Sequence, residues 1–372
     1  MREPLHTILC TVGTSLVGHI TPAAGRPSAL PDVAEAWSEG DFEAVARRVA
    51  ALGPDDRRTG AELQSLYDLV ARGHARPDAR IELFHSATPD GRAAARVVAE
   101  VLRRRGHPVE LHEVEHLQDA DPKRFRSKGL RVLVKLLCRA VRAWGTAGTG
   151  IDATGGYKAQ IAVAVVIGQA LGVPVFYRHE RFPEVISFPP LPVSLDYGLW
   201  MRWSGVLAAL DRGEWVRWLD VADDWEPVME TMVERVALEE SEFLDLSAMG
   251  QVFHEAFRHR FRSEADRLLP PPATQKSQPR LTDHAWGGAR TRIGALLARV
   301  VDDTPYVTSC RTHYWNPDLP SACLFRLRGE GIEGVWSDGT WTVKFWVDTT
   351  AVTPGQREAC VADLNARVAQ WR

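Results

Sequence analysis

The first half of the sequence predicts an α/β domain with a mainly parallel, Rossmann-like sheet. Strand-like runs alternate with helical runs between residues 6 and 190. Successive strands leave room for little but a helix between them, and such crossover connections give parallel strands that are covered on both faces. The strand-like runs are residues 6–12, 79–85, 107–115, 150–151 and 173–180, and the helical runs are residues 41–53, 91–106, 130–145 and 158–172.

Residues 191–266 have a different pattern, in which helical stretches surround a short hairpin. Tryptophan and leucine side chains fall on related faces of a helix over residues 195–212. A second amphipathic helix is expected over residues 226–236, a hairpin over residues 237–247, and a further helix over residues 248–262. Helices around a hairpin predict a small winged-helix-like domain, and a helical spacer is the alternative.

Residues 267–282 form the clearest boundary in the chain. Three consecutive prolines followed by small polar residues favour neither a helix nor a packed core, so these residues predict a linker. Residues 283–372 then predict a compact α+β domain with one helix, four strand-like runs and a final helix. Turn signals at residues 328–331 and 338–339 separate the last three strands into an antiparallel meander.

The composition argues against a nucleic-acid coat protein, a disulfide-rich secreted protein and a membrane protein. The formal net charge of −3 argues against a protein that coats nucleic acid, so any such binding has to come from a local patch. The five cysteines are odd in number and have no metal-ligand spacing, which fits a reducing cytosol. The first residues lack the features of a signal peptide, and no apolar run predicts a membrane span. We expect a cytoplasmic protein without a membrane partner.

Three polar loops follow predicted strands and are expected to meet at one edge of the sheet. Glycines in these loops permit close approach of a ligand to the backbone, and a helix N-terminus with a nearby lysine favours an anion such as phosphate. Simple turn chemistry is the alternative for any single loop. The loop residues are Thr11, Gly13, Thr14 and Ser15, then His85 and Ser86, and finally Thr154, Gly155, Gly156 and Lys158.

Two common nucleotide-binding motifs are missing from the sequence. No GxGxxG follows the first predicted strand, which weakens an NAD-binding interpretation. No Walker A motif occurs, which weakens a P-loop interpretation.

The same loops resemble a known family. TVGTSL at residues 11–16 and D-x-TGG-x-K at residues 152–158 are similar to motifs of the CARF domains of type III CRISPR ancillary proteins, and residues 173–196 resemble the end of that domain. The resemblance implies a homodimer that binds cyclic oligoadenylate as an allosteric activator and uses no cofactor. It assigns Thr11, Gly13, Thr14, Ser15, Thr154, Gly155, Gly156 and Lys158 to the ring of adenylates and phosphates.

A sensor needs an output domain, and two common ones are disfavoured after residue 190. The nearest approach to the Arg-to-His spacing of HEPN ribonucleases is Arg280 and His284, which are one residue too close and lie at the linker. Restriction-type nucleases need an Asp or Glu two positions before a lysine at a metal site. Neither Lys276 nor Lys344 has one.

The last domain instead resembles RelE-type mRNA interferases. Residues 321–336 have the pattern of that family's central hairpin, and Arg326 and Arg328 fall at its basic positions. These nucleases need no metal, because cationic side chains stabilise the transition state when the RNA 2′-hydroxyl attacks the adjacent phosphate. The expected catalytic residues are Arg326, Arg328, Lys344, Arg311, His313 and Tyr314. The family's usual arginine on or after the last strand is missing from residues 346–350.

The leading functional interpretation is a ribonuclease gated by a signal molecule. Cyclic oligoadenylate, with tetra-adenylate as the expected ring, would activate a metal-independent endoribonuclease that cuts ribosome-bound mRNA in type III CRISPR antiviral defence. In residues 284–372 ten Lys or Arg face nine Asp or Glu, so dependence on the ribosome as a partner is expected. The alternative is a transcription regulator with the same sensor and a DNA-binding winged helix. The cationic run at residues 258–262 is either a solvated helix face or a nucleic-acid contact.

Overall fold

The structure is a computed structural model that describes residues 3–22, 27–179, 182–282, 284 and 286–372. Glu180, at the end of the last predicted strand run of the first domain, and Asp283, at the predicted start of the last domain, lie outside the described residues. The chain forms two compact units, Met1–Ser194 and Leu195–Arg372. Each unit is described by itself.

The first unit is built on a six-stranded sheet in the order β3-β2-β1-β4-β5-β6. Every neighbouring pair is parallel except β5 and β6, which confirms the predicted mainly parallel, Rossmann-like sheet. The strand order reverses direction between β1 and β4, and ligands bind at such switch points in open α/β sheets. The strands are β1 (Leu5–Val12), β2 (Ala75–Ser86), β3 (Val109–Val114), β4 (Thr149–Asp152), β5 (Val175–Tyr177) and β6 (Ile186–Phe188).

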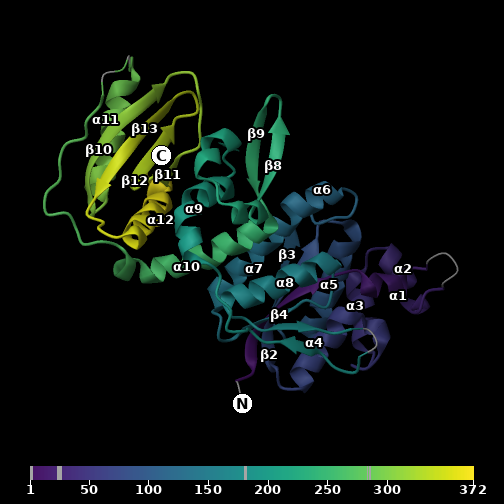
Figure 1. The fold of residues 1–372 in the computed structure, drawn as a ribbon. Coiled ribbons are helices and arrows are strands. Elements are labelled where there is room, and N and C mark those ends of the chain that lie inside the picture. The colour runs from purple at the N-terminus through teal and green to yellow at the C-terminus, as the bar shows by residue number, and fades with distance from the viewer. Residues whose placement is uncertain (1–2, 23–26, 180–181, 283, 285) are drawn as a thin grey trace. The chain divides into compact units, whose positions relative to one another are not determined.

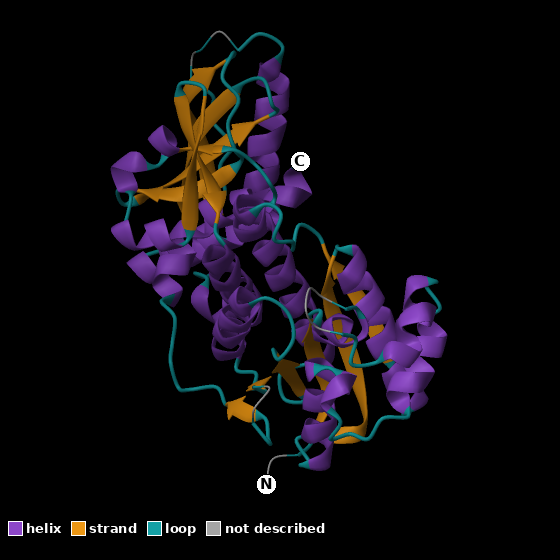
Figure 2. Ribbon diagram, turned by 90° about the vertical axis from the view of Figure 1, so that its right-hand side faces the viewer, coloured by secondary structure: helices purple, strands orange, loops and turns teal. Residues whose placement is uncertain are grey.

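Helices lie on both sides of this sheet (Figures 1 and 2). One core joins the β1 side chains of Ile8 and Cys10 to apolar residues of α1, α3, α4 and α5. The period-two alternation of the strands leaves their other side chains for the opposite face. The helices are α1 (Ser15–Ile20), α2 (Pro31–Ser38), α3 (Phe42–Ala50), α4 (Ala61–Ala71), α5 (Pro89–Arg104), α6 (Pro122–Arg124), α7 (Leu130–Trp144) and α8 (Lys158–Leu171).

Local signals explain where α5 begins and where α8 ends. Thr88 accepts a hydrogen bond from Gly91 N at the start of α5, and Pro89 occupies the first turn, where its missing N–H costs nothing. Helix α8 ends at Gly172, whose φ of 71° is left-handed and favours glycine. The loops after β2 and β4 lead into α5 and α8.

The second unit contains a four-stranded antiparallel sheet in the order β10-β13-β12-β11. Its strands β10 (Val307–Asn316), β11 (Leu324–Arg328), β12 (Gly331–Ser337) and β13 (Thr342–Thr349) confirm the predicted meander. One face of the sheet packs Phe325, Val343 and Phe345 against apolar residues of α11 (Ala289–Asp303) and α12 (Pro354–Trp371). The opposite face carries the charged side chains discussed below.

The preceding residues of this unit form α9 (Tyr197–Asp211), a small sheet of β7 (Val216–Arg217), β8 (Val233–Leu238) and β9 (Ser241–Leu246), and α10 (Ala248–Leu268). The predicted helix over residues 226–236 is wrong. Pro227–Thr231 is a short 3-10 helix, and the residues after it pair with β9, as in the match of Val233 with Leu246. Val233 is buried when it pairs with β9, and the free energy gained by this burial outweighs the helix preference that the apolar spacing of residues 226–236 indicated.

The expected linker over residues 267–282 is held against the sheet. The backbone N–H groups of Ala273, Ser277 and Arg280 donate to carbonyls of residues 305, 308 and 310, at or just before β10. Lys276 Nζ donates to Val301 O and Thr304 O, at the carboxyl end of α11. An edge strand and a helix end both offer unpaired backbone groups, so a proline-rich segment without its own secondary structure can pair with them.

The stretches predicted as a winged-helix-like domain and as a RelE-like domain share a hydrophobic core. Leu207 and Leu210 of α9 belong to the same buried cluster as Leu324 and Val335 of the large sheet. Asn365 of α12 donates to the carbonyl of Phe325 and accepts from its N–H, both at 2.8 Å. Residues 195–372 therefore form one compact unit.

Candidate functional site

A pocket of about 680 Å³ lies where the polar loops of the first unit meet. It is found at the carboxyl ends of β1, β2 and β4, next to the first turn of α8. Eight of the ten residues predicted to bind the ligand line this pocket. They are Gly13, Thr14, Ser15, Ser86, Thr154, Gly155, Gly156 and Lys158.

The two remaining predicted residues do not line the pocket. The side chain of Thr11 is buried and donates to Gly155 O at 2.6 Å, so it ties the first loop to the loop after β4. The buried His85 ring is 3.0 Å from Ser86 O through its Nδ1 atom. Thr11 lies in β1 and His85 in β2, and their side chains contact the backbone of Gly155 and Ser86 at the ends of the strands.

A buried carboxylate that the sequence analysis missed organises the floor of this pocket. Glu62 of α4 accepts from Gly13 N at 2.7 Å through Oε1 and from Ser15 Oγ at 2.9 Å through Oε2. Both carboxylate oxygens are therefore occupied by the first loop. Glu62 lies outside every loop motif, so only the packing of α4 against β1 shows its role.

The loop glycines are required because the backbones of the two loops approach closely. A Cβ atom on Gly155 would lie 2.3 Å from Glu62 Oε1 and 2.5 Å from Thr11 O. Gly155→Ala is therefore expected to displace Glu62 and to lower the free energy of unfolding by about 1–3 kcal/mol. Urea unfolding measures this, and Gly18→Ala is the matched control, because a Cβ atom on Gly18 meets nothing within 4 Å. Equal stability of the two variants would contradict the tight packing of the loops.

The pocket also contains cationic and aromatic side chains. Lys158 opens α8, and Arg178 directly follows β5. Thr154 Oγ1 accepts from Arg178 N at 2.9 Å, and Arg178 Nη1 donates to Gln64 O at 2.8 Å, which fixes the arginine beside the loop. Tyr157 and Tyr177 line the same pocket. Arg178 was not predicted from its sequence context, although its position directly after a parallel strand at this edge of the sheet is a signal for a ligand-binding residue.

The pocket can therefore bind an anion that carries aromatic groups. Lys158 and Arg178 supply positive charge, and the N–H groups at the start of α8 add the helix dipole. Asp90 and Asp119 are also among the lining residues and offer carboxylate acceptors to donor groups of the same ligand.

Asp152, at the end of β4, accepts two hydrogen bonds from the pocket residue Thr154. Its Oδ1 accepts from Thr154 Oγ1 at 2.6 Å and from Thr154 N at 3.1 Å. Burial raises the pKa of Asp152 to about 6 from its ordinary 3.8. The hydrogen bonds from Thr154 and Ser65 lower this pKa, and the negative charge of Glu62 raises it further. The buried carboxyl is therefore easier to protonate in the folded protein than in the unfolded chain.

This raised pKa predicts a pH-dependent effect of Asp152→Asn. Because the folded pKa is the higher one, the stability contributed by the neutral carboxyl is fully present below the unfolded pKa and is lost as pH rises through about 6. The asparagine cannot ionise but can still accept from Thr154, so the variant should gain up to ~3 kcal/mol in unfolding free energy at about pH 8 and far less at about pH 4. Urea unfolding at both pH values measures this, and an equal change at both would contradict it.

A second cluster of polar side chains lies on the charged face of the large sheet in the second unit. Its centre is Glu333 of β12, which is fully buried. Glu333 Oε2 accepts from Arg326 Nε at 2.8 Å and lies 2.7 Å from Arg326 Nη2. Glu333 Oε1 lies 3.0 Å from His313 Nε2 and 3.5 Å from Arg328 Nη1. The carboxylate therefore joins three of the six predicted catalytic residues.

Cross-strand register produces this cluster. Arg326 pairs with Glu333, Glu333 pairs with Trp346, and Trp346 pairs with Arg311, so one row crosses all four strands. A register shift between Thr312 and Tyr314 interrupts the pairing of β10 at His313. The His313 ring stacks on Trp346 with a centroid distance of 4.9 Å.

The other predicted residues lie on the same strands. Lys344 Nζ is 5.1 Å from the centroid of the Tyr314 ring, and these residues are cross-strand partners. Arg311 is exposed on β10, where the backbone of Arg280 pairs with it. The sheet thus brings Lys344 and Tyr314 together beside the Glu333 cluster, and it leaves Arg311 at the edge.

The environment of His313 favours its neutral form. Burial lowers the pKa of His313 below its ordinary 6.5, and the charges of Lys344 and Arg328 act in the same direction. Glu333 opposes them by raising this pKa. A carboxylate beside Nε2 favours the tautomer that carries its proton on Nε2, which leaves Nδ1 able to accept a proton.

Arg326 lies on the predicted strand but is buried there. Its side chain is only 9% exposed, and besides Glu333 it donates to the backbone carbonyl of Asp220. Its guanidinium donors are occupied by Glu333 and by the carbonyl of Asp220, so we expect Arg326 to hold Glu333 in position. Arg328, in contrast, is exposed and leaves donors available.

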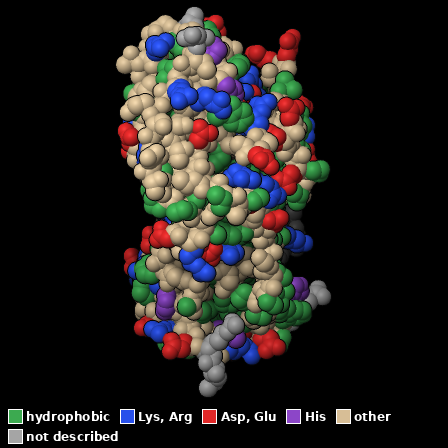
Figure 3. Space-filling view, turned by 60° about the vertical axis from the view of Figure 1, so that its left-hand side comes forward, with side chains coloured by type: hydrophobic (Ala, Val, Ile, Leu, Met, Phe, Trp, Pro, Cys, Tyr) green, Lys and Arg blue, Asp and Glu red, His purple; other side chains and the backbone are tan. Residues whose placement is uncertain are grey.

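Other charged groups offer weaker candidates. Arg258 of the cationic run pairs with Asp211 at 3.1 Å and Glu255 at 2.7 Å, and Arg260 pairs with Glu264 at 3.0 Å. These partners favour a solvated helix face over a nucleic-acid contact. Figure 3 likewise shows cationic and anionic side chains interspersed on the face in view.

One group among the described residues has metal-ligand atoms close together, namely Glu82, Glu110 and His112. Glu82 already accepts hydrogen bonds from Trp144 Nε1 and lies 3.0 Å from His112 Nε2. These contacts satisfy the buried carboxylate without an ion. In the described part of the chain, no helix is both long enough and apolar enough to cross a membrane.

Comparison with known proteins bears on the first unit. Residues 57–191 match the model of a family described as CRISPR-associated protein (Cas_APE2256). This match supports a CRISPR-associated protein. The matched segment includes the pocket residues Ser86, Thr154 and Lys158. No curated protein matches the chain.

Proposed function

We propose that this protein is a cytoplasmic endoribonuclease of type III CRISPR antiviral defence that cyclic oligoadenylate activates. In this proposal a homodimer binds the cyclic ligand through its first unit and cuts ribosome-bound mRNA with its second unit. The observation that carries the nuclease assignment is the contact of buried Glu333 with both His313 and Arg328. The family match of residues 57–191 supports the CRISPR context.

The first pocket has the groups that a cyclic oligoadenylate needs. Lys158 and Arg178 can pair with phosphates, and Tyr157 and Tyr177 offer rings for stacking on adenine. The carboxylates of Asp90 and Asp119 can accept from the exocyclic amino group of adenine. We expect tetra-adenylate to be the preferred ring.

The second cluster can cleave RNA without a metal ion. The neutral His313 accepts the proton of the RNA 2′-hydroxyl at Nδ1, while its Nε2 faces Glu333 Oε1 at 3.0 Å. The 2′-oxygen then attacks the adjacent phosphorus, and the bond from phosphorus to the 5′-oxygen breaks. The products are a 2′,3′-cyclic phosphate and a 5′-hydroxyl group. Arg328 and Lys344 stabilise the charge that develops on the phosphate oxygens.

The proton for the departing 5′-oxygen is assigned to the protonated His313 or to Lys344.

Ribosome dependence fits the small number of free cations in the site. Arg326 is occupied by Glu333 and Asp220, so few groups remain to orient a flexible mRNA. A ribosome would supply that orientation, which is worth a large part of the barrier in such reactions.

Gating sets an energetic requirement. The ligand has to bind the active arrangement more tightly than the resting one, and a hundredfold activation needs about 2.7 kcal/mol of differential affinity.

The alternative of a DNA-binding regulator is less well supported. The hairpin of β8 and β9 is the element that would serve as a wing, and it has five acidic residues and one arginine, for a net charge of −4. That arginine, Arg235, pairs with Glu230 and covers the Trp218 ring. Such a hairpin would repel a phosphate backbone.

A translation reaction tests the proposal. Purified ribosomes and a defined mRNA are combined with the protein and with cyclic tetra-adenylate, cyclic hexa-adenylate or no ligand, and the 5′ ends of the RNA are mapped. We expect cuts only when ribosomes and one cyclic ligand are both present. Intact mRNA in every reaction, with the ligand bound, would overturn the nuclease assignment.

A further inference from the structure

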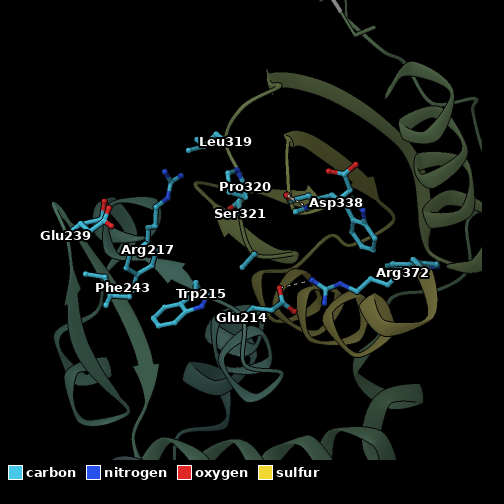
Figure 4. A pocket seen from close by; sticks show the side chains of 17 residues that line it. Glu214, Trp215, Arg217, Glu239, Phe243, Leu319, Pro320, Ser321, Asp338 and Arg372 are labelled. Atoms are coloured by element: carbon cyan, nitrogen blue, oxygen red, sulfur yellow. Dashed lines mark hydrogen bonds and ion pairs between the residues drawn. The ribbon is translucent and has the colours of Figure 1, made fainter. Parts of the chain in front are cut away.

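A second, larger cavity of about 1100 Å³ lies within the second unit. One wall is formed by the small β7-β9-β8 sheet and the other by residues 319–322 and 336–339 and the end of α12. Figure 4 shows Trp215, Arg217 and Phe243 on one side and Leu319, Pro320 and Ser321 on the other. Neither Glu333 nor any of the six predicted catalytic residues lines this cavity.

The walls of the cavity are strongly apolar, and part of that apolar surface is accessible. Trp215 is 57% exposed and packs edge-on against Phe243 at a centroid distance of 5.4 Å. Leu238, near the tip of the hairpin, is 42% exposed. Trp336 and Trp371 are buried at the opposite wall. Exposed aromatic side chains around a hollow are typical of sites that bind a partner.

The charges around the cavity indicate what kind of partner fits. The two arginines that line it are neutralised, because Arg217 Nε is 2.9 Å from Asp220 Oδ2 and Arg372 Nη2 is 2.9 Å from Glu214 Oε2. Glu239 also lines the cavity. Glu239 and its neighbour Glu240 form the turn between β8 and β9, so this part of the rim repels polyanions and attracts cations.

We propose that this cavity is a docking site for a cationic protein segment that inserts one bulky apolar side chain. The apolar side chain would pack against Trp215 and Phe243, and flanking lysines or arginines would face the acidic hairpin. This combination of an aromatic anchor and complementary charge gives affinity through the anchor and selectivity through the charge. The inference goes beyond the proposed nuclease activity and does not depend on it.

Fluorescence anisotropy of the full chain with labelled synthetic peptides tests this proposal. The first peptide consists of lysines and arginines around one central tryptophan, the second has serine in place of that tryptophan, and the third has glutamates in place of the cations. Labelled oligouridylate, titrated in a separate experiment without peptide, is the nucleic-acid probe. We expect the first peptide to bind most tightly, the other two peptides to bind weakly, and oligouridylate binding to be the same for the wild type and Trp215→Ala.

Two variants locate the binding. Trp215→Ala should weaken binding of the first peptide by about thirtyfold, the usual loss at a tryptophan anchor. Glu239→Lys combined with Glu240→Lys should weaken it by about tenfold or more, mainly by removing charge attraction. Val352→Ala is the control, because Val352 is 80% exposed and does not line the cavity.

Thermal melting of each variant checks that the protein is folded. Unchanged binding by folded Trp215→Ala protein would overturn the proposal. Binding of labelled oligouridylate to the wild type that Trp215→Ala abolishes would overturn it as well, and would assign the cavity to RNA. Because the readout is peptide binding, it is independent of whether the protein cuts mRNA.

Discussion

His313→Ala protein is expected to lose cleavage of ribosome-bound mRNA by about 10²–10⁴-fold, the usual contribution of a general base. His313 is the neutral imidazole in the cluster, and Glu333 fixes its ring 3.0 Å away. The loss should lie in the chemical step, so binding of cyclic tetra-adenylate should not change. Single-turnover cleavage rates and ligand calorimetry on the same protein measure the two effects.

His259→Ala is the matched control for this experiment. His259 is exposed on α10 of the same unit, outside the Glu333 cluster, so its removal should leave cleavage at the wild-type rate. Equal loss of activity in both variants would point to a general effect on the unit. Full activity of His313→Ala protein would remove His313 from the reaction.

Glu333→Gln extends this test to pH. The charge of Glu333 raises the pKa of His313, so its removal should lower that pKa further. The acid limb of the pH–rate profile should then move to lower pH, while the maximal rate falls because the imidazole is less well oriented. A simple loss of structure would not move the limb. A limb that stays in place would show that Glu333 does not act on the titrating group.

Lys158→Ala combined with Arg178→Ala is expected to weaken binding of cyclic tetra-adenylate by at least about a hundredfold. Each cation can make a charge-assisted hydrogen bond to phosphate worth roughly 1.5–3 kcal/mol. Both side chains line the pocket, and neither is required to hold the buried pair of loops together. Isothermal calorimetry with cyclic tetra-adenylate and with linear adenylate measures the loss and its selectivity.

A double variant of α6 provides the control for ligand binding. Lys123→Ala combined with Arg124→Ala removes the same net charge from exposed positions that do not line the pocket. Binding should then change little, because screened charges at the surface contribute weakly. A similar loss in both double variants would mean that overall charge, and not the pocket, determines affinity.

Local patterns were sufficient to predict much of the fold and part of both sites. Thr154 and Lys158, which the motif after β4 singled out, line one pocket, and Arg326 and Arg328 both contact Glu333, while their roles stay predictions. The approximate ranges of helices followed from periodicity, as for α8, which was predicted over residues 158–172 and is found over Lys158–Leu171. These features depend on neighbours in the sequence, which is why one sequence is enough to predict them.

The missed residues depend on contacts between distant segments. Glu333 becomes central only through the register that pairs β12 with β11 and brings β13 and β10 alongside. Glu62 belongs to an ordinary amphipathic helix, and only the packing of that helix places its carboxylate under Gly13. Thr11 was assigned to the ligand because of its motif, although its side chain holds Gly155. Sequence spacing does not contain this information.

We propose that ligand binding in the first unit controls chemistry in the second. The most direct test is the single-turnover cleavage rate of ribosome-bound mRNA with and without saturating cyclic tetra-adenylate. It is measured for the wild-type protein, for His313→Ala and for the Lys158→Ala and Arg178→Ala double variant. We predict strong activation of the wild type by the ligand, cleavage by His313→Ala that is slower by about 10²–10⁴-fold despite ligand binding, and no activation of the double variant at the same ligand concentration. Wild-type cleavage at one rate with and without bound ligand would contradict the account.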